Sequence, residues 1–235
     1  MIPDRAFYVN PNNIKSNYFH LSETESRHAS KVLRLCAGDE VFILDGIGSA
    51  YVAKIIKMDF LCVKGEILES YSNFGENSIT IKIAPAIIKN DKFKMIIQKG
   101  TELGVNQFHP LLLDRCITKK INYSKIEKVI ISASKQCRRS RFPKLEKMKT
   151  LEKFLKETNG PIIAGVMSSN NNIENLNIIN SKQISIIIGP EGDFSNSEID
   201  IMKYYNVLFC KFGPRRLRSE TAAIYSLALL NERFQ

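Results

Sequence analysis

The chain of 235 residues is long enough for one large domain or two of modest size. Hydrophobic residues make up 44% of it and charged residues 25%, which is typical of a globular protein with a substantial core. It has no run of about 18 apolar residues, as a membrane span requires, and its N-terminus lacks the basic-then-apolar order of a signal peptide, so a cytoplasmic protein is expected. The five cysteines are odd in number and form no C-x-x-C pair, which argues against a disulfide framework and against a zinc site.

The positive charge is concentrated in one part of the chain. The formal net charge is +10, but residues 1–72 carry −1 and residues 73–235 carry +11. A basic domain attracts polyanions, so this asymmetry favours RNA or DNA as a partner. The alternative is a lysine-rich composition in which the charged side chains are only solvated surface.

The first third of the chain alternates short strands with turns. Residues 23–35 have apolar positions at helical spacing, and residues 39–46, 49–58 and 60–68 are rich in the Val, Ile and aromatic residues of strands. Asp45-Gly46 suits a hairpin turn. One helix with several short strands indicates a small β-barrel, followed by a polar linker over residues 70–77.

Beyond the linker, strands alternate with helices. The expected strands are 78–85, 108–113, 161–167, 184–194 and 206–213, and the expected helices are 91–104, 124–137, 195–205 and 221–230. Such alternation, with nearly continuous apolar strands, indicates an α/β fold with a mostly parallel sheet covered on both faces. Asp91 is the expected N-cap of the first helix, and the pairs Ser124/Glu127 and Ser195/Glu198 predict capping boxes.

Three of the expected strands end in segments that suit a ligand site: AGVMSS, GPEGDFS and GPRRLRSETA. In open α/β sheets, ligands bind at the carboxyl ends of strands. GPEG is neither a P-loop nor G-x-G-x-x-G, and Gly-Pro turns occur in many loops, so composition leaves the ligand open. The crowding of Arg215, Arg216, Arg218 and Glu220 before an apolar helix favours a functional loop over a merely solvated one.

Two C-terminal motifs, IIIGPEGDFSNSEI and FGPRRLRSETAA, closely resemble those of the bacterial 16S ribosomal RNA uridine-N3 methyltransferases, which belong to the knotted SPOUT superfamily. The segments RHASKVLRLCAGDEV, KMIIQKGTELGV, PLLLDRC and SKQCRRSRFP extend the resemblance over nearly the whole chain. It implies an RNA-binding, PUA-like β-barrel over residues 1–72 and a methyltransferase domain over residues 73–235 that ends in a trefoil knot. It also implies S-adenosylmethionine as cofactor, 16S ribosomal RNA of the small ribosomal subunit as substrate, and a homodimer whose partner subunit completes each site.

The resemblance assigns the cofactor pocket to the three strand-end loops. The residues that it places there are Val166, Gly189, Glu191, Gly192, Gly213, Leu217, Arg218, Glu220 and Thr221. It also makes Gln136 a functional member of its motif. The net charge of +11 favours phosphate contacts by the basic run Arg138, Arg139, Arg141 and Lys144, for which a solvated helix end is the alternative. Arg27, His28 and Arg34 on the first helix are further candidates for RNA contact, although a surface or packing role suits His28 as well.

Methyl transfer to N3 of uridine requires that the ring lose its N3 proton. A guanidinium near O2 or O4 would stabilise the negative charge, and Arg218 is the first candidate, with Arg139 of the partner subunit second. Glu220 is the candidate general base, and the alternative is an acid that interacts with the dipole of the last helix. No metal is required by this chemistry.

This sequence departs from the family pattern at a few positions. Asp193 replaces the usual second glycine after GPEG, and Ser219 replaces a threonine. In the motif E-Q-[SC]-G-R, Lys135 replaces the acid and Arg138 replaces the glycine, so Gln136 and Arg139 are expected to be its functional members. Two other functions remain open at this point: a non-catalytic RNA-binding or ribosome-assembly factor, and a ribose 2′-O methyltransferase of RNA.

Overall fold

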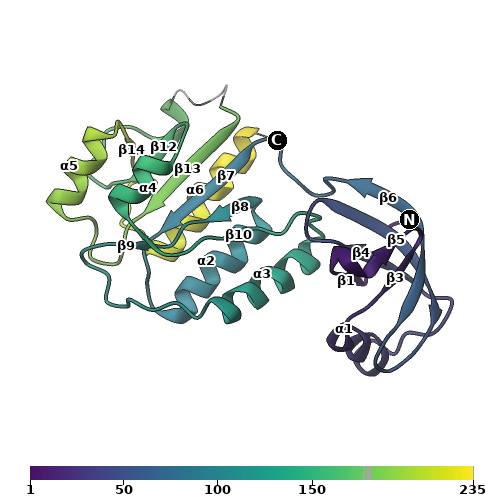
Figure 1. Cartoon of the computed structure of the whole chain (residues 1–235). Helices are drawn as coiled ribbons and strands as arrows, with labels where there is room; N and C mark the ends of the chain where they lie inside the picture. The colour runs from purple at the N-terminus through teal and green to yellow at the C-terminus, as the bar shows by residue number, and fades with distance from the viewer. Residues whose placement is uncertain (177, 179–180, 235) are drawn as a thin grey trace. The chain divides into compact units, whose positions relative to one another are not determined.

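The computed structural model describes residues 1–176, 178 and 181–234, and the chain divides into two compact units (Figure 1). The first unit comprises Met1–Glu76 together with Ile131–Phe142, and the second comprises Asn77–Ile130 with Pro143–Gln235. The helix α3 (Tyr123–Cys137) is therefore divided between the two units. In the part of the chain that the structure describes, no helix is long and apolar enough to cross a membrane.

The first unit is built on a six-stranded sheet in the order β1-β4-β5-β6-β3-β2. β1 pairs with β4 in parallel, and the other neighbours are antiparallel. The helix expected over residues 23–35 is present as α1 (Glu23–Arg27), which continues into a π-helical turn. The strands are β1 (Ala6–Tyr8), β2 (Ile14–Lys15), β3 (Tyr18–His20), β4 (Glu40–Leu44), β5 (Ser49–Lys57) and β6 (Lys64–Ser72), and a 3-10 turn, η1, spans Pro11–Asn13.

The predicted hairpin turn after β4 is confirmed. The buried Asp45 carboxylate accepts hydrogen bonds from the backbone N–H groups of Ile47, Gly48 and Ser49 at 2.8, 3.0 and 2.8 Å. Gly46 has a φ of 76°, a conformation in which L side chains are strained. The dipeptide thus supplies both the hydrogen-bond acceptor and the left-handed residue that the turn needs.

The strand β4 is buried on both faces of the sheet, and its successive side chains point to opposite faces. Val41 and Ile43 of β4 belong to one buried cluster, whereas Phe42 and Leu44 belong to another. Phe142 packs against the second cluster, which explains why the segment that follows α3 belongs to the first unit.

The second unit contains a six-stranded sheet in the order β10-β8-β7-β13-β12-β14, with every neighbouring pair parallel. A separate parallel pair joins β9 to β11. The strands are β7 (Thr80–Pro85), β8 (Val105–Phe108), β9 (Leu111–Leu112), β10 (Lys144–Leu145), β11 (Lys149–Thr150), β12 (Ile162–Gly165), β13 (Gln183–Ile188) and β14 (Leu208–Cys210). The helices are α2 (Asn90–Glu102), α4 (Leu151–Glu157), α5 (Asn196–Tyr204) and α6 (Ser219–Phe234), with a 3-10 turn, η3, at Ile173–Asn175.

Helices cover both faces of this parallel sheet, as predicted (Figure 1). Ala84, Ala164 and Ile187 of three neighbouring strands pack in one cluster with residues of α4 and α5. Their neighbours in the strands, such as Ile83 and Ile186, point to the opposite face. There α2 and α6 pack against each other and against the strands. The strands are therefore apolar on both sides and hold the loops at their carboxyl ends on a rigid frame.

The predicted helix starts are only partly correct. The capping box of Ser195 and Glu198 at α5 is confirmed. The capping box predicted for Ser124 is wrong, because the side chain of Asn122 accepts the hydrogen bond from the backbone of Lys125 instead. Asp91 is not an N-cap either, since α2 begins at Asn90 and the residue before it makes no side-chain cap.

Candidate functional site

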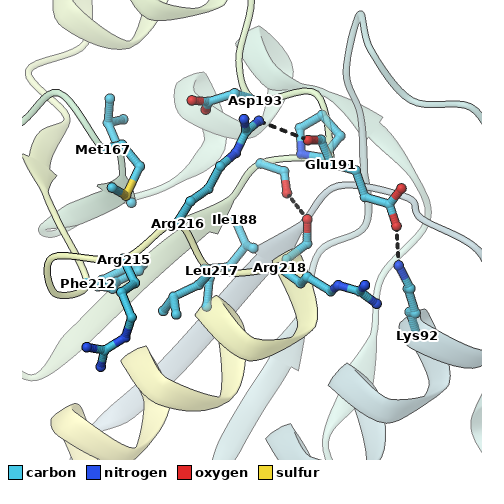
Figure 2. A pocket seen from close by; sticks show the side chains of 16 residues that line it. Lys92, Met167, Ile188, Glu191, Asp193, Phe212, Arg215, Arg216, Leu217 and Arg218 are labelled. Atoms are coloured by element: carbon cyan, nitrogen blue, oxygen red, sulfur yellow. Dashed lines mark hydrogen bonds and ion pairs between the residues drawn. The ribbon is translucent and has the colours of Figure 1, made fainter.

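A cavity of about 410 Å³ lies at the carboxyl ends of β12 and β13 and beside the segment that follows β14 (Figure 2). These are the three strand ends from which the sequence predicts a ligand site. The cavity has apolar and charged lining residues in similar number. They are Lys92, Gly165, Val166, Met167, Ile188, Gly189, Pro190, Glu191, Asp193, Phe212, Arg215, Arg216, Leu217, Arg218, Ser219 and Ala222.

The structure brings five of the nine predicted cofactor-binding residues to the cavity wall: Val166, Gly189, Glu191, Leu217 and Arg218. The other four are not in the wall. Gly192 lies against the side chain of Arg115, and Gly213 adopts a φ of 88° in open space, where an added Cβ would meet no atom within 4 Å. Glu220 and Thr221 lie in the first turn of α6, where Glu220 is buried and Thr221 is exposed.

Sequence reasoning missed Lys92, which reaches the cavity from the first turn of α2. The strand that precedes α2, β7, is the neighbour of β13 in the sheet. The start of α2 therefore lies at the same edge of the sheet as the GPEG turn. The strand order was needed to see this. Met167, Asp193, Arg215 and Arg216 belong to the predicted loop motifs and also line the cavity, although the resemblance does not place them there.

Charged groups meet at one end of the cavity (Figure 2). The Lys92 ammonium forms an ion pair with the carboxylate of Glu191 and lies 4.0 Å from Oε1 of Glu220. The hydrogen bond from Lys92 holds the pKa of the Glu191 carboxyl below its ordinary value, and the positive charge of Arg218 acts in the same direction. Glu191 is therefore ionised at neutral pH.

Glu220 is buried, and its Oε2 atom has no hydrogen-bond partner among the described residues. A buried polar atom without a partner costs about 1–3 kcal/mol, so such atoms concentrate at functional sites or at sites filled by water. Two positive potentials compensate the carboxylate: the Lys92 ammonium and the N-terminal end of α6. Both roles that the sequence suggests for Glu220, base and helix-end acid, are compatible with this place.

Two hydrogen bonds join the loops of the cavity. The hydroxyl of Ser219 donates to the carbonyl oxygen of Gly189 at 2.7 Å, and the guanidinium of Arg216 donates to the carbonyl oxygen of Glu191 at 3.4 Å. The segment after β14 is thereby fixed against the turn after β13. Ser219, a departure from the family's threonine, keeps the hydroxyl that this contact requires.

The predicted RNA contacts of α3 and the following loop lie in the first unit, and so does the second catalytic candidate, Arg139. Arg139 is 2% exposed and forms an ion pair with Glu76 at 2.7 Å. Arg141 is exposed and donates to Oδ1 of Asn73 at 3.0 Å. Gln136 is exposed. Lys135, which replaces an acid of the family pattern, forms an ion pair with Glu25 at 2.7 Å. Glu25 thus balances the positive charge that this replacement introduces.

The three RNA-contact candidates on the first helix are all on the surface. Arg27 is paired with Glu23 at 2.5 Å, and Arg34 has a φ of 54° directly beyond the helical segment. His28 is exposed and also lies edge-on to the ring of Phe7, with 6.2 Å between the ring centroids. Surface position and packing thus coexist at His28.

Arg138 and Asp193 replace glycines of the family pattern, and both have positive φ, 60° and 63°. Asp193 adapts well, because its carboxylate accepts a hydrogen bond from the next backbone N–H at 2.8 Å. Arg138 makes no such local bond; its guanidinium pairs with Asp4, whose side chain is 96% exposed. Exposed ion pairs contribute little.

Arg138→Gly is therefore expected to stabilise the protein. The left-handed conformation costs about 1–2 kcal/mol for an ordinary L residue, and glycine avoids this cost. Glycine also loses more conformational entropy on folding, so the net increase in the free energy of unfolding should be about 0.5–1 kcal/mol. Urea unfolding of the two proteins measures the difference. Arg138→Ala, which removes the same charge but keeps the strain, is the control and should give no gain.

The cavity suits a ligand with a flat apolar part and several polar groups. Val166, Ile188 and Leu217 offer apolar surface, and carboxylates and guanidinium groups lie around them. Among residues 1–176, 178 and 181–234, no three His, Cys, Asp or Glu side chains gather as a metal site. A parallel α/β sheet with such a cavity at the carboxyl ends of its strands is typical of the cofactor-binding α/β class of enzymes.

Comparison with known proteins narrows this class. The chain matches the model of the RNA methyltransferase domain over residues 75–231 and that of the RNA methyltransferase PUA domain over residues 21–67. Ribosomal RNA small subunit methyltransferase E of Rickettsia conorii is 30% identical over 94% of this chain and 92% of its own, and that of Bacillus subtilis is 26% identical over 91% and 89%. The chain belongs to this family of ribosomal RNA small subunit methyltransferases.

Solved structures agree with the fold. A protein of Legionella pneumophila in complex with bound S-adenosylmethionine is 28% identical, covers 98% of both chains and has a TM-score of 0.87. Ribosomal RNA small subunit methyltransferase E of Neisseria gonorrhoeae, 24% identical over 97% of both chains, has a TM-score of 0.89. The mixed α/β fold with a parallel sheet and an N-terminal PUA-like domain is thus confirmed.

Proposed function

We propose that this protein transfers the methyl group of S-adenosylmethionine to N3 of a uridine in 16S ribosomal RNA. The observation that carries the proposal is the cavity at the carboxyl ends of β12 and β13, with Arg218 and Lys92 in its wall. Membership of the ribosomal RNA methyltransferase family supports the reaction class and the RNA substrate. We expect the reaction to take place in the cytoplasm and to need no metal.

The cofactor pocket is assigned to the wall of this cavity. Val166, Ile188 and Leu217 would hold the apolar part of the cofactor, and the carboxylate of Glu191 would offer acceptors to its polar groups. When bound, S-adenosylmethionine supplies an electrophilic methyl group. Gly192, Gly213 and Thr221 act on the pocket through the conformation of its loops and of the start of α6.

The residues of this chain must also handle the charge and the proton of the uracil ring. Arg218 stabilises the negative charge that develops on O2 or O4 when N3 loses its proton. Glu220, whose Oε1 lies 4.0 Å from the Lys92 ammonium, receives this proton as general base. Orientation of the ring by the RNA-binding residues supplies much of the remaining acceleration.

Nucleoside analysis tests the assignment of the product. Small ribosomal subunits from a strain that lacks this enzyme are incubated with the protein and S-adenosylmethionine, and the 16S ribosomal RNA is digested and examined by mass spectrometry. We expect one 3-methyluridine per subunit. A 2′-O-methylated nucleoside would establish the ribose methyltransferase instead, and absence of any methylated product would favour a non-catalytic assembly factor.

Substitution of Gly165 tests the location of the cofactor. A Cβ on Gly165 would lie 2.2 Å from the ring of Phe212, which lines the cavity, so Gly165→Ala should push this ring into the pocket. We expect at least tenfold weaker binding of S-adenosylmethionine in calorimetric titration, since misplaced wall atoms cost about 1–3 kcal/mol. Gly100→Ala is the matched steric control, because a Cβ on Gly100 would lie 2.8 Å from the ring of Phe108, which does not line the cavity. This variant should bind S-adenosylmethionine normally. Equal weakening in both variants would contradict the location.

A homodimer completes the site in this proposal, with Arg139 and the RNA contacts Gln136, Arg138 and Arg141 supplied by the partner subunit. The side chains that line the cavity all belong to the second unit, whereas these four residues belong to the first. Sedimentation equilibrium measures the oligomeric state. Activity of a strictly monomeric protein would remove the need for a partner.

We also infer a trefoil knot at the C-terminal end of the second unit. The chain leaves β14 beside β12 and returns to pack α6 against β13 and β7. Near its end, Arg233 donates to the carbonyl oxygens of Ile173 and Leu176 at 2.9 and 2.8 Å, within the long connection from β12 to β13. Circular forms of the protein test the knot. One is closed by joining the termini of the folded chain and the other by joining those of the unfolded chain, and their electrophoretic mobilities are compared under denaturing conditions. A circle that contains a knot stays more compact than one that does not.

A further inference from the structure

A hollow of about 350 Å³ lies on the sheet of the first unit, outside every residue that the sequence assigns to RNA. It is lined from the strands β2, β3, β5 and β6 and their connections. Three of its residues are exposed lysines: Lys15, Lys57 and Lys64. The side chains of Tyr18 and Ile56, which also line it, are 56% and 51% exposed.

The strand register places two lysines opposite each other. Lys57 of β5 faces Lys64 of β6, next to an irregularity of the register between Ile55 and Lys57. On the other side of Lys64, the residue opposite it is His20 of β3. Like charges in directly opposed positions destabilise a sheet. The unit therefore keeps an arrangement that costs stability, which is expected where the charges serve a ligand.

Nearby acids do not neutralise this group. Glu66, the next residue of β6 on the same face, stands opposite Lys54 and Tyr18. Within the described part of the chain, no ion pair within 4.0 Å involves Lys15, Lys57 or Lys64. The lysines are thus available to an external anion.

An exposed aromatic ring lies beside these cations. Tyr18 stands opposite Lys15 in the β2–β3 pair, and His20 follows two residues later on the same face of β3. Neighbouring strands are about 4.8 Å apart, so the row from Lys57 to His20 spans roughly 10 Å of sheet. Cations that follow a backbone beside a ring that can stack on a base are the parts of a site for single-stranded nucleic acid.

We propose that this hollow binds a single-stranded segment of the RNA substrate, with the three lysines on phosphates and Tyr18 stacked on a base. The proposal rests on the proposed function for the identity of the RNA and adds a contact surface away from the methyl-transfer cavity. The hollow holds the substrate through its backbone and one base, and takes no part in the chemical step.

A triple variant, Lys15→Gln with Lys57→Gln and Lys64→Gln, tests the phosphate contacts in the full-length protein. Binding is measured by fluorescence anisotropy on a labelled, unstructured RNA of about 12 nucleotides, at several salt concentrations. We expect affinity at least tenfold weaker at low salt. The slope of log K against log salt should fall by about 2, since each phosphate contact to a single strand contributes about 0.7.

The control removes the same charge elsewhere. Lys153, Lys156 and Lys203 are exposed lysines of α4 and α5, each paired with an acid of its own helix. Their triple glutamine variant should change the slope much less than the first variant. Equal slopes in the two variants would overturn the proposal, because only net charge would then matter.

Tyr18 separates stacking from charge. Tyr18→Ala should weaken binding about tenfold, whereas Tyr18→Phe, which keeps the ring, should bind nearly as the wild type does. Equal binding of Tyr18→Ala and wild type, or tighter binding of a duplex of the same sequence, would overturn the single-strand assignment. Thermal unfolding of each variant shows whether the unit still folds.

S-adenosylmethionine titration of the triple lysine variant keeps the two proposals apart. Its cofactor affinity should equal that of the wild type, since no lysine of the hollow lines the methyl-transfer cavity. If the wild type forms no 3-methyluridine, the proposed function is rejected. The RNA-binding measurements on the variants would still decide whether the hollow binds RNA.

Discussion

Arg218→Ala should lower the rate of methyl transfer in a single turnover about 10²–10³-fold while S-adenosylmethionine binding changes by less than about fivefold. Removal of one charge-stabilising donor from an active site typically has an effect of this size. Arg218 lines the cavity, and its guanidinium lies on the side where Lys92 and Glu191 meet (Figure 2). Transfer of a radioactive methyl group to ribosomal subunits, with calorimetry for the cofactor, measures both quantities.

Arg215 provides the matched control for this experiment. It lines the same cavity and carries the same charge, but its side chain points away from Lys92 and Glu191 (Figure 2). Arg215→Ala should slow the chemical step far less than Arg218→Ala. If Arg218→Ala instead weakens cofactor binding and leaves the single-turnover rate at saturation unchanged, then Arg218 binds the cofactor and does not stabilise charge on the ring.

Loss of Arg139 or of Glu76 should lower the free energy of unfolding by about 3–5 kcal/mol. The two side chains are 3% and 6% exposed and form an ion pair at 2.7 Å. Removal of one member of a buried pair leaves an uncompensated charge, which is a large penalty. Glu76 also accepts the backbone N–H of Arg141 at 2.9 Å, so Glu76→Ala breaks a second contact. Denaturant unfolding of Arg139→Ala and Glu76→Ala gives both values.

The double variant shows how much of this effect belongs to the pair. If burial is the cause, Arg139→Met with Glu76→Leu should be far more stable than the sum of the two single losses predicts, because neither charge is left alone. Near-normal stability of Arg139→Ala together with loss of methyl transfer would show that Arg139 acts mainly in the reaction, as the proposed dimeric site requires.

Local sequence patterns were sufficient to predict four strands of the second unit's sheet, β7, β12, β13 and β14, but not β8 at Val105–Phe108 or the edge strand β10 at Lys144–Leu145. β13 and α6 follow from apolar runs and helical spacing, and the capping box at Ser195 fixed the start of α5. The short helix α4, Leu151–Glu157, was missed, because seven residues give too little periodicity to separate a helix from a loop. The start of α3 was predicted to within one residue, but its capping side chain is Asn122 and not Ser124, since serine and asparagine compete as caps over a few positions.

The residues of the candidate site could be predicted only where they come directly after a strand in the sequence. GPEG and the arginine-rich segment lie directly after β13 and β14, so the rule on strand ends locates them. Lys92 could be placed in the site only from the strand order, in which β7 is the neighbour of β13. In the sequence, 99 residues separate it from its partner Glu191. The partnership of Arg139 with Glu76, 63 residues apart, was equally invisible to local patterns.

Two hydrogen bonds, Ser219 to Gly189 and Arg216 to Glu191, join the loops that form the cavity, so a cofactor bound there would stabilise the folded second unit. A ligand that binds only the folded form adds about 2.7 kcal/mol at a concentration 100 times its Kd. Starvation for the methyl donor would therefore increase opening of the second unit and its degradation by proteases. The abundance of the enzyme, and not only its turnover, would then follow the metabolic state of the cell.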